Sequence, residues 1–192
     1  MFLDPYELYK ERCGSIEIIC GSMFSGKTQE LIRRIKRAKL AKLNVQVYKP
    51  RIDTRYNSQK IVSHNTQSID ANTVESSNEI LSLIEDRTNV VGIDECQFFK
   101  DNVTVTCNKL VNKGIRVIVS GLDMDFLGNP FGNMPHLLAI SDHITKLHAI
   151  CTECGDLANH SHRISKEKDI IHLGEKDNYK ALCRKCFKTH KS

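Results

Sequence analysis

Short apolar runs recur along the first three quarters of the chain, and polar residues or glycines bound each one. A run of four to eight residues rich in Ile and Val, with such boundaries, is typical of a strand buried inside a sheet. We therefore predict buried strands over residues 15–20, 45–48, 90–93 and 115–119.

Between these runs, the apolar positions change to a helical spacing. A helix is predicted over residues 28–42 because its apolar side chains return to one face, at Leu31, Ile32, Ile35 and Ala38. A second helix is predicted over residues 101–112, where Asp101 is suited to cap the first turn. Strands that alternate with helices favour parallel pairing, so the pattern predicts an α/β sheet covered on both faces.

Two stretches depart from this alternation. Residues 50–75 are polar with weak periodicity, and we predict a long loop with little regular structure. After residue 150 the alternation stops, and two cysteine pairs bracket a polar stretch. The sequence therefore predicts an α/β domain over residues 1–150 and a small second domain over residues 151–192.

The composition is that of a globular chain, and its charge is only mildly basic. The 192 residues are 40% hydrophobic and 27% charged, with a net charge of +5 and a pI near 8.7. This balance permits anionic ligands without demanding nucleic acid. No apolar run approaches a membrane span, and the first twelve residues lack a signal-peptide core, so we expect a cytoplasmic protein without a membrane partner.

A phosphate-binding loop follows the first predicted strand. Residues 21–28 fit G-x-x-x-x-G-K-[ST] at every fixed position, and the first predicted helix starts there. Such a loop turns main-chain N–H groups and a helix N-terminus toward phosphate oxygens. Lys27 would reach the β- and γ-phosphates, and the Thr28 hydroxyl would bind Mg²⁺. The ATP-binding candidates are Gly21, Ser22, Met23, Phe24, Ser25, Gly26, Lys27 and Thr28.

Two acids end the strand predicted over residues 90–93. Asp94 is the candidate Mg²⁺ ligand, since an aspartate at a strand end serves this purpose in P-loop proteins. Glu95 can then take the proton of an attacking hydroxyl or water. The pair predicts Mg²⁺-dependent attack on the γ-phosphate of a nucleoside triphosphate, and it leaves the acceptor open between a substrate hydroxyl and water.

Four cysteines have the spacing of a zinc site. Two C-x₂-C pairs, Cys151 with Cys154 and Cys183 with Cys186, would supply four thiolates to one tetrahedral ion. A site with four protein ligands has no open position, so the zinc would be structural. It would also pin both ends of the intervening loop, which could close over a small ligand as a lid.

Two interpretations other than a kinase are open at this point. The first is a P-loop ATPase that binds nucleic acid through a zinc ribbon and a basic helix. The modest net charge, the lack of tryptophan and the long loop between the cysteine pairs count against it. The second is a zinc-stabilised module that binds ATP only as a structural ligand, which the intact acid pair disfavours.

The motifs together resemble one known family, the thymidine kinases of the cellular, zinc-containing type. The resemblance rests on the phosphate loop, residues 53–56 (DTRY), residues 94–99 (DECQFF), Gly121-Leu122-Asp123 with Phe126 and Pro130-Phe131-Gly132, and the cysteine pairs. It implies a P-loop, RecA-like parallel sheet with a small C-terminal zinc-binding lasso domain. It also implies salvage synthesis of thymidine monophosphate from thymidine and ATP.

The resemblance further implies roles for particular residues. Glu95 would be the general base and Asp94 the residue tied to Mg²⁺, with Asp53, Arg55 and Gln97 in the set near the cofactor. Phe126 would line the thymine pocket, and Tyr179 would pack on the nucleoside. The loop between the cysteine pairs would read the base edge through its backbone, at Ile170, Ile171, His172, Leu173 and Gly174.

The same resemblance implies a homotetramer and feedback inhibition by dTTP. It implies small-molecule substrates and no nucleic-acid partner.

Overall fold

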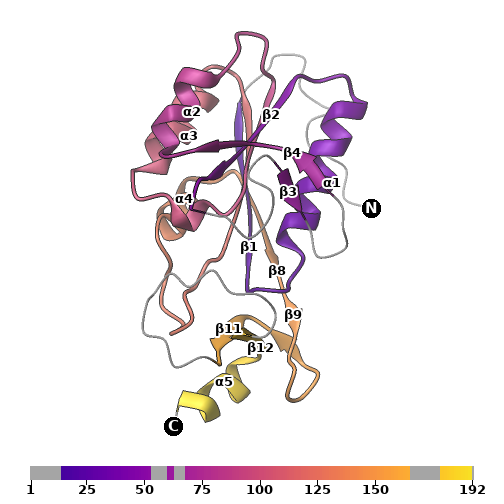
Figure 1. Ribbon diagram of the computed structural model, residues 1–192, viewed down its shortest axis with the longest axis vertical. Helices are drawn as coiled ribbons and strands as arrows, with labels where there is room; N and C mark the ends of the chain where they lie inside the picture. Colours follow the sequence, from indigo (N-terminus) through magenta and orange to yellow (C-terminus); the bar gives the residue numbers. More distant parts are fainter. Residues whose placement is uncertain (1–13, 53–59, 63–67, 165–177, 192) are drawn as a thin grey trace.

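The computed structural model describes residues 14–52, 60–62, 68–164 and 178–191. Figure 1 shows the order of the elements along the chain. They are β1 (Ser15–Gly21), α1 (Lys27–Leu40), β2 (Val45–Pro50), β3 (Lys60–Val62), β4 (Ser68–Asp70), β5 (Asn72–Val74), α2 (Ser77–Leu83), β6 (Val90–Ile93), the short 3₁₀ helix η2 (Cys96–Phe98), α3 (Val103–Val111), β7 (Arg116–Gly121), α4 (Met134–Ile140), β8 (His143–Leu147), β9 (Ala149–Ile150), β10 (Leu157–Ala158), β11 (His160–Arg163), β12 (Tyr179–Leu182) and α5 (Arg184–Lys191).

A six-stranded parallel sheet forms the centre of the fold, in the order β5-β2-β6-β7-β1-β8. All four strands predicted from apolar runs lie in it, as β1, β2, β6 and β7. The predicted α/β class with a parallel sheet is therefore confirmed. Because β7 separates β1 from β6, the phosphate loop and the acid pair extend from strands that are not direct neighbours.

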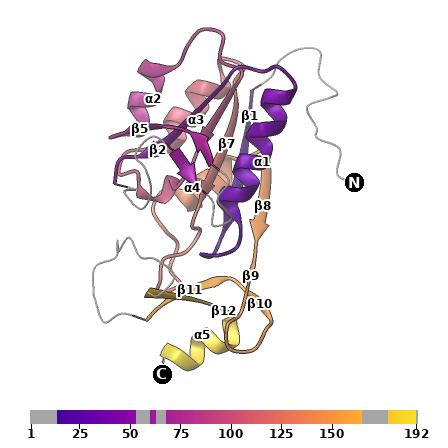
Figure 2. The same cartoon turned by 45° about the vertical axis from the view of Figure 1, so that its right-hand side comes forward.

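Helices cover both faces of this sheet (Figures 1 and 2). On one face α1 buries its predicted apolar stripe, which includes Leu31, Ile32 and Ile35, against β-strand residues such as Val47. On the other face α2, α3 and α4 enclose a second cluster. Alternate residues of β1 enter the two clusters, Ile18 one and Ile19 the other, as the two-residue period of a strand requires.

The prediction of a long loop with little regular structure over residues 50–75 was wrong in part. The described residues of this stretch include the antiparallel pair β3–β4 and the strand β5, which joins the main sheet beside β2. Ile61 and Ile69 from the pair pack into the cluster beneath α1. Three-residue strands are too short to produce a recognisable period.

The helix predicted from Asp101 begins two residues later, at Val103, and Asn102 is its cap: the Asn102 side chain accepts the Thr104 N–H at 3.2 Å. Asp101 serves α2 instead. Its carboxylate accepts the N–H groups of Ser77 and Asn78, both at 3.1 Å, and the Ser77 hydroxyl at 2.6 Å. Although partial burial opposes ionisation, these donors lower the pKa of Asp101.

The sequence did not predict β8, α2 or α4, and each has a weak pattern. β8 is an edge strand, and its Ile144 is 54% exposed, so no apolar run marks it. The helices α2 and α4 have seven residues each and bury only two side chains apiece.

Beyond β8 the chain forms a smaller lobe at the lower end of the molecule in Figures 1 and 2. It contains the two-stranded pairs β9–β10 and β11–β12 and the helix α5, around a third apolar cluster that includes Leu182 and Phe187. Phe24 of the phosphate loop packs against this cluster. We call this smaller lobe, which consists of residues 149–164 and 178–191, the cysteine lobe. Within the part of the chain that the structure describes, no helix has both the length and the apolarity needed to cross a membrane.

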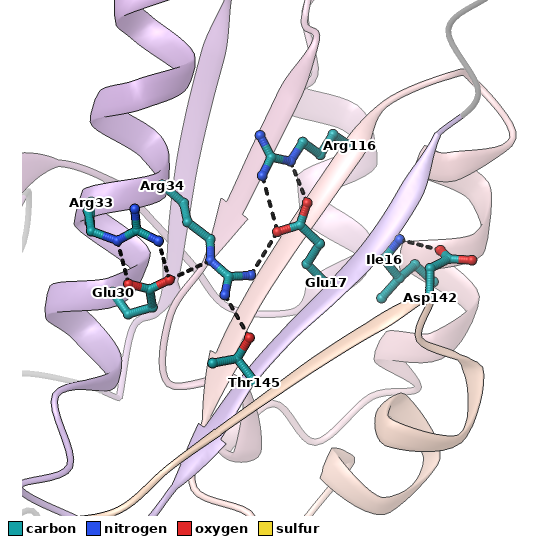
Figure 3. A network of polar contacts seen from close by, with 8 residues as sticks. All are labelled: Ile16, Glu17, Glu30, Arg33, Arg34, Arg116, Asp142 and Thr145. Atoms are coloured by element: carbon teal, nitrogen blue, oxygen red, sulfur yellow. Dashed lines mark hydrogen bonds and ion pairs between the residues drawn. The ribbon is translucent and has the colours of Figure 1, made fainter. Parts of the chain in front are cut away.

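A buried ion-pair network ties α1 to the sheet (Figure 3). Glu17 on β1 accepts the Arg116 Nε–H of β7 at 2.6 Å and an Arg34 Nη1–H of α1 at 2.8 Å. Arg34 also donates to Thr145 of β8 at 2.7 Å and to Glu30 at 2.8 Å. Glu17 and Arg116 are both almost inaccessible to water, so each depends on the other for compensation of its charge.

We expect Arg116→Met to destabilise the fold by roughly 3 kcal/mol, because the substitution leaves the Glu17 carboxylate buried with one partner fewer. The matched control is Arg33→Met, which removes an exposed pair with Glu30 and should cost at most about 1 kcal/mol. Urea unfolding measures both, and equal midpoints for the two variants would contradict the role given to the buried pair.

Candidate functional site

The carboxyl ends of β1, β7 and β6 meet at one edge of the sheet. In register, Cys20 lies beside Gly121 and Val119 lies beside Ile93. The phosphate loop leaves β1 at this edge, the acid pair leaves β6, and Leu122 leaves β7. Parallel pairing therefore gathers three motifs that are far apart in the sequence.

The phosphate loop has the curled backbone that its glycines and its position predict. Positive φ angles occur at Phe24 (64°) and Gly26 (88°), and α1 starts at Lys27. The Lys27 ammonium donates to the Ser22 carbonyl oxygen at 2.8 Å, so the lysine side chain folds back over its own loop. Its ammonium therefore lies inside the curl, where a phosphate chain would need a positive charge.

The acid pair is connected directly to this loop. The Thr28 hydroxyl donates to Asp94 Oδ2 at 3.4 Å, and the other oxygen of Asp94 accepts the Glu95 N–H at 3.0 Å. Asp94 is buried, with 4% of its surface exposed. Hard oxygen donors such as this hydroxyl and carboxylate are the protein ligands that suit Mg²⁺. The two residues predicted to share the ion are thus adjacent.

Glu95 adopts a backbone conformation that is uncommon outside glycine, with φ 51° and ψ 39°. Its carboxylate accepts the Gln97 Nε2–H at 2.5 Å, and Gln97 Oε1 accepts the Leu122 N–H at 2.9 Å. Strained residues of this kind gather at functional sites, where the surrounding contacts hold them in place.

Phe126 and Tyr179, which the resemblance assigned to the nucleoside, share one partner that sequence reasoning missed. Arg163 lies with its guanidinium carbon 3.9 Å from the centre of the Phe126 ring. It donates from Nε and Nη2 to the Tyr179 hydroxyl, at 3.0 and 2.7 Å. Arg163 is buried on β11, and no local motif marks it, because its contacts come from distant parts of the chain.

The cysteine lobe also holds the phosphate loop. The Ser22 hydroxyl donates to the Ala158 carbonyl oxygen at 3.3 Å, and the Met23 N–H donates to the Ser161 hydroxyl oxygen at 2.9 Å. These contacts come from residues between the two cysteine pairs, and no motif predicted that Ala158 and Ser161 lie against the phosphate loop. The phosphate loop is therefore supported both by the main sheet and by the cysteine lobe.

The four cysteines of the predicted zinc site come together as expected. The Sγ atoms of Cys151, Cys154, Cys183 and Cys186 all lie within 4.8 Å of one another, and those of Cys154 and Cys183 are 3.6 Å apart. Zn–S bonds of about 2.3 Å in a tetrahedron require sulfur separations of about 3.8 Å. The donor set and its spacing therefore fit one zinc ion.

Among the described residues, three further cysteines, Cys20, Cys96 and Cys107, are buried side chains of the core. Burial raises the pKa of Cys20 to about 11 and that of Cys107 to about 12, and it raises the pKa of Cys96 well above its usual range. These thiols therefore stay protonated and unreactive near neutral pH.

Some of the predicted site residues lie outside the described residues. They are Asp53, Arg55, Ile170, Ile171, His172, Leu173 and Gly174. Their assigned places near the phosphates and the base stay predictions.

The fold and the site together define a P-loop nucleotide-binding protein with an acid pair beside its phosphate loop and a cluster of four cysteines whose spacing suits a metal ion. The family model described as Thymidine kinase matches residues 14–187. The chain belongs to the thymidine kinase family.

Curated relatives agree over almost the whole chain. It is 54% identical to a thymidine kinase of Bacteroides thetaiotaomicron and 52% identical to one of Bacteroides fragilis, in each case over 97% of this chain and 94% of the relative. A Porphyromonas gingivalis thymidine kinase is 49% identical over 92% of this chain and 86% of the relative. Among solved structures, the Legionella pneumophila ATPase DotB aligns at 14% identity with a TM-score of 0.42, over 68% of this chain and 35% of that one.

Proposed function

We propose that this protein transfers the γ-phosphate of ATP to the 5′-hydroxyl of thymidine in the presence of Mg²⁺, in salvage synthesis of thymidine monophosphate. The observation that carries the proposal is the match to thymidine kinases along nearly the full chain. The phosphate loop and the acid pair, joined through Thr28 and Asp94, supply the chemistry that this reaction needs.

In the proposed reaction each residue has one task. Lys27 and the loop amides bind the β- and γ-phosphates, and Thr28 and Asp94 would hold Mg²⁺, which neutralises phosphate charge when bound. Glu95 accepts the proton of the 5′-hydroxyl as its oxygen bonds to the γ-phosphorus and the bond to the β,γ-bridging oxygen breaks. Asp53 and Arg55, the other two residues predicted to lie near the cofactor, are proposed to act near the phosphates.

The nucleoside is proposed to lie between the main sheet and the cysteine lobe. Phe126 and Tyr179 would pack against it, with Arg163 fixing both aromatic side chains. Backbone groups of residues 170–174 would read the base edge, so that a wrong base leaves a buried polar group unpaired. A pocket closed in this way excludes water and thereby suppresses ATP hydrolysis.

We extend the proposal by resemblance to the rest of the protein. The chain would divide near residue 150 into a nucleotide-binding domain and a zinc-binding lasso domain. The enzyme would be a cytoplasmic homotetramer, subject to feedback by dTTP and without a nucleic-acid partner.

A substrate panel tests the central proposal. Purified protein with Mg²⁺ and radiolabelled ATP is expected to phosphorylate thymidine far faster than the deoxynucleosides of adenine, guanine and cytosine. Single-stranded DNA or RNA should leave ATP turnover unchanged. Absence of phosphorylated nucleoside, together with ATP hydrolysis that nucleic acid stimulates and salt suppresses, would favour the alternative ATPase.

A further inference from the structure

We propose that Gln97 is a positioning residue that holds the Glu95 carboxylate in place for proton transfer. The inference rests on the proposed role of Glu95 as the base. In this inference Gln97 acts on the side chain of Glu95, whereas the family resemblance alone places Gln97 among the residues near the cofactor.

The amide of Gln97 satisfies two partners in one orientation. Its Nε2–H faces the Glu95 carboxylate at 2.5 Å, and its Oε1 faces the Leu122 N–H at 2.9 Å. A flipped amide would set Oε1 against a carboxylate and Nε2–H against an N–H, so neither bond would survive. Gln97 is 3% exposed, which favours both bonds over competition with water.

The surrounding backbone fixes Gln97 in turn. A Cβ on Gly121 would lie 2.8 Å from Gln97 Oε1, and a Cβ on Gly132 would lie 2.4 Å from the Gln97 carbonyl oxygen. Gly132 also has φ 51°. The two glycines of the Gly-Leu-Asp and Pro-Phe-Gly motifs thus leave the space that Gln97 occupies.

These contacts complete the restraint of Glu95. Its N–H donates to Asp94 Oδ1, its carbonyl oxygen accepts the Phe98 N–H at 3.1 Å, and its carboxylate accepts the Gln97 amide. Three hydrogen bonds therefore hold Glu95 in its left-handed backbone conformation. Such restraint matters because a general base must stay within hydrogen-bond reach of the hydroxyl that it deprotonates.

Two substitutions separate this role from a role in binding magnesium or ATP. Gln97→Met removes both hydrogen bonds with an apolar side chain of similar length. Gln97→Glu keeps an acceptor for the Leu122 N–H but places a second carboxylate against Glu95. Either change should lower kcat roughly 10–100-fold and leave the KM for ATP and the half-saturating Mg²⁺ concentration within twofold.

The division between kcat and KM gives a readout that a merely structural role would not move. A variant that only loosened the fold would lower the Tm and raise the KM values, whereas a base held less firmly lowers kcat alone. Gln46→Met is the matched control, since Gln46 also bonds through both amide atoms but lies on β2 toward the opposite edge of the sheet.

The outcomes separate clearly. A lower kcat with unchanged KM for ATP and unchanged Mg²⁺ dependence in both Gln97 variants, and a normal Gln46→Met, would support the inference. An unchanged kcat, or a change confined to the Mg²⁺ and ATP dependence, would overturn it, while wild-type thymidine turnover would leave the proposed function standing. A wild-type protein that phosphorylates no nucleoside would instead remove the proposed function.

Discussion

Glu95→Gln is expected to lose most of the thymidine kinase turnover, with kcat lower by a factor of roughly 10²–10⁴. The substitution keeps the size of the side chain and one oxygen that can accept the Gln97 amide, but it removes the ability to accept a proton in the transition state. The Asp94 and Thr28 contacts do not involve the Glu95 side chain, so binding of ATP should persist.

The measurement is steady-state kinetics with thymidine and Mg-ATP, together with direct ATP binding to the variant. Glu85→Gln is the matched control, since Glu85 is an exposed carboxylate that follows α2, and this variant should keep wild-type turnover. If Glu95→Gln turned over within threefold of the wild type, another group would have to take the proton, and the mechanism proposed above would fail.

The phosphate loop and the acid pair could be predicted from the sequence because each is local. A strand, a loop and the start of a helix follow one another within residues 15–40, and the acids directly follow β6. The cysteine pairs are equally local, and their spacing fixes the chemistry before any fold is known. The parallel sheet then follows from the alternation of strands and helices, and it brings these motifs to one edge.

The interactions that the sequence did not predict join distant segments through side chains of ordinary type. Arg163 was one basic residue in a polar stretch, and only the pairing of β11 with β12 sets it beside Tyr179. Asp101 had the right residue type for a cap, but it caps α2 instead of the helix that follows it. Residue type and local spacing indicate which interactions a side chain can make. Tertiary packing determines which residue becomes its partner.

The contacts between the phosphate loop and the cysteine lobe change what the zinc site is expected to do. A zinc ion held by four cysteines would fix the turn between β9 and β10 relative to the junction of β12 and α5. The strand β11, paired with β12, carries Ser161 against the Met23 N–H and Arg163 against Phe126. Loss of the metal should therefore affect ATP binding as well as nucleoside binding.

Cys183→Ser should accordingly weaken both the fold and the site. Loss of one thiolate opens the coordination shell, and zinc binding free energy is folding free energy in such lobes. We expect less than one zinc per chain and a KM for thymidine about tenfold higher. The Tm should fall by roughly 5–10 °C, because a loss of about 2–3 kcal/mol produces such a shift in a chain of this size. The KM for ATP should rise by a smaller factor, because the sheet still supports the loop.

Metal analysis, thermal unfolding and steady-state kinetics on the same preparations measure these effects. Arg184→Ser is the matched control, since Arg184 is the exposed neighbour of Cys183 and should leave all three quantities unchanged. A variant with wild-type Tm and wild-type KM values would show that the zinc site supports neither the lobe nor the pocket. A lower Tm with unchanged KM values would show that the metal stabilises the lobe but does not support substrate binding. A lobe that loosened around Ser161 and Arg163 would also disturb the phosphate loop and the side chains of Phe126 and Tyr179, so the KM values would change.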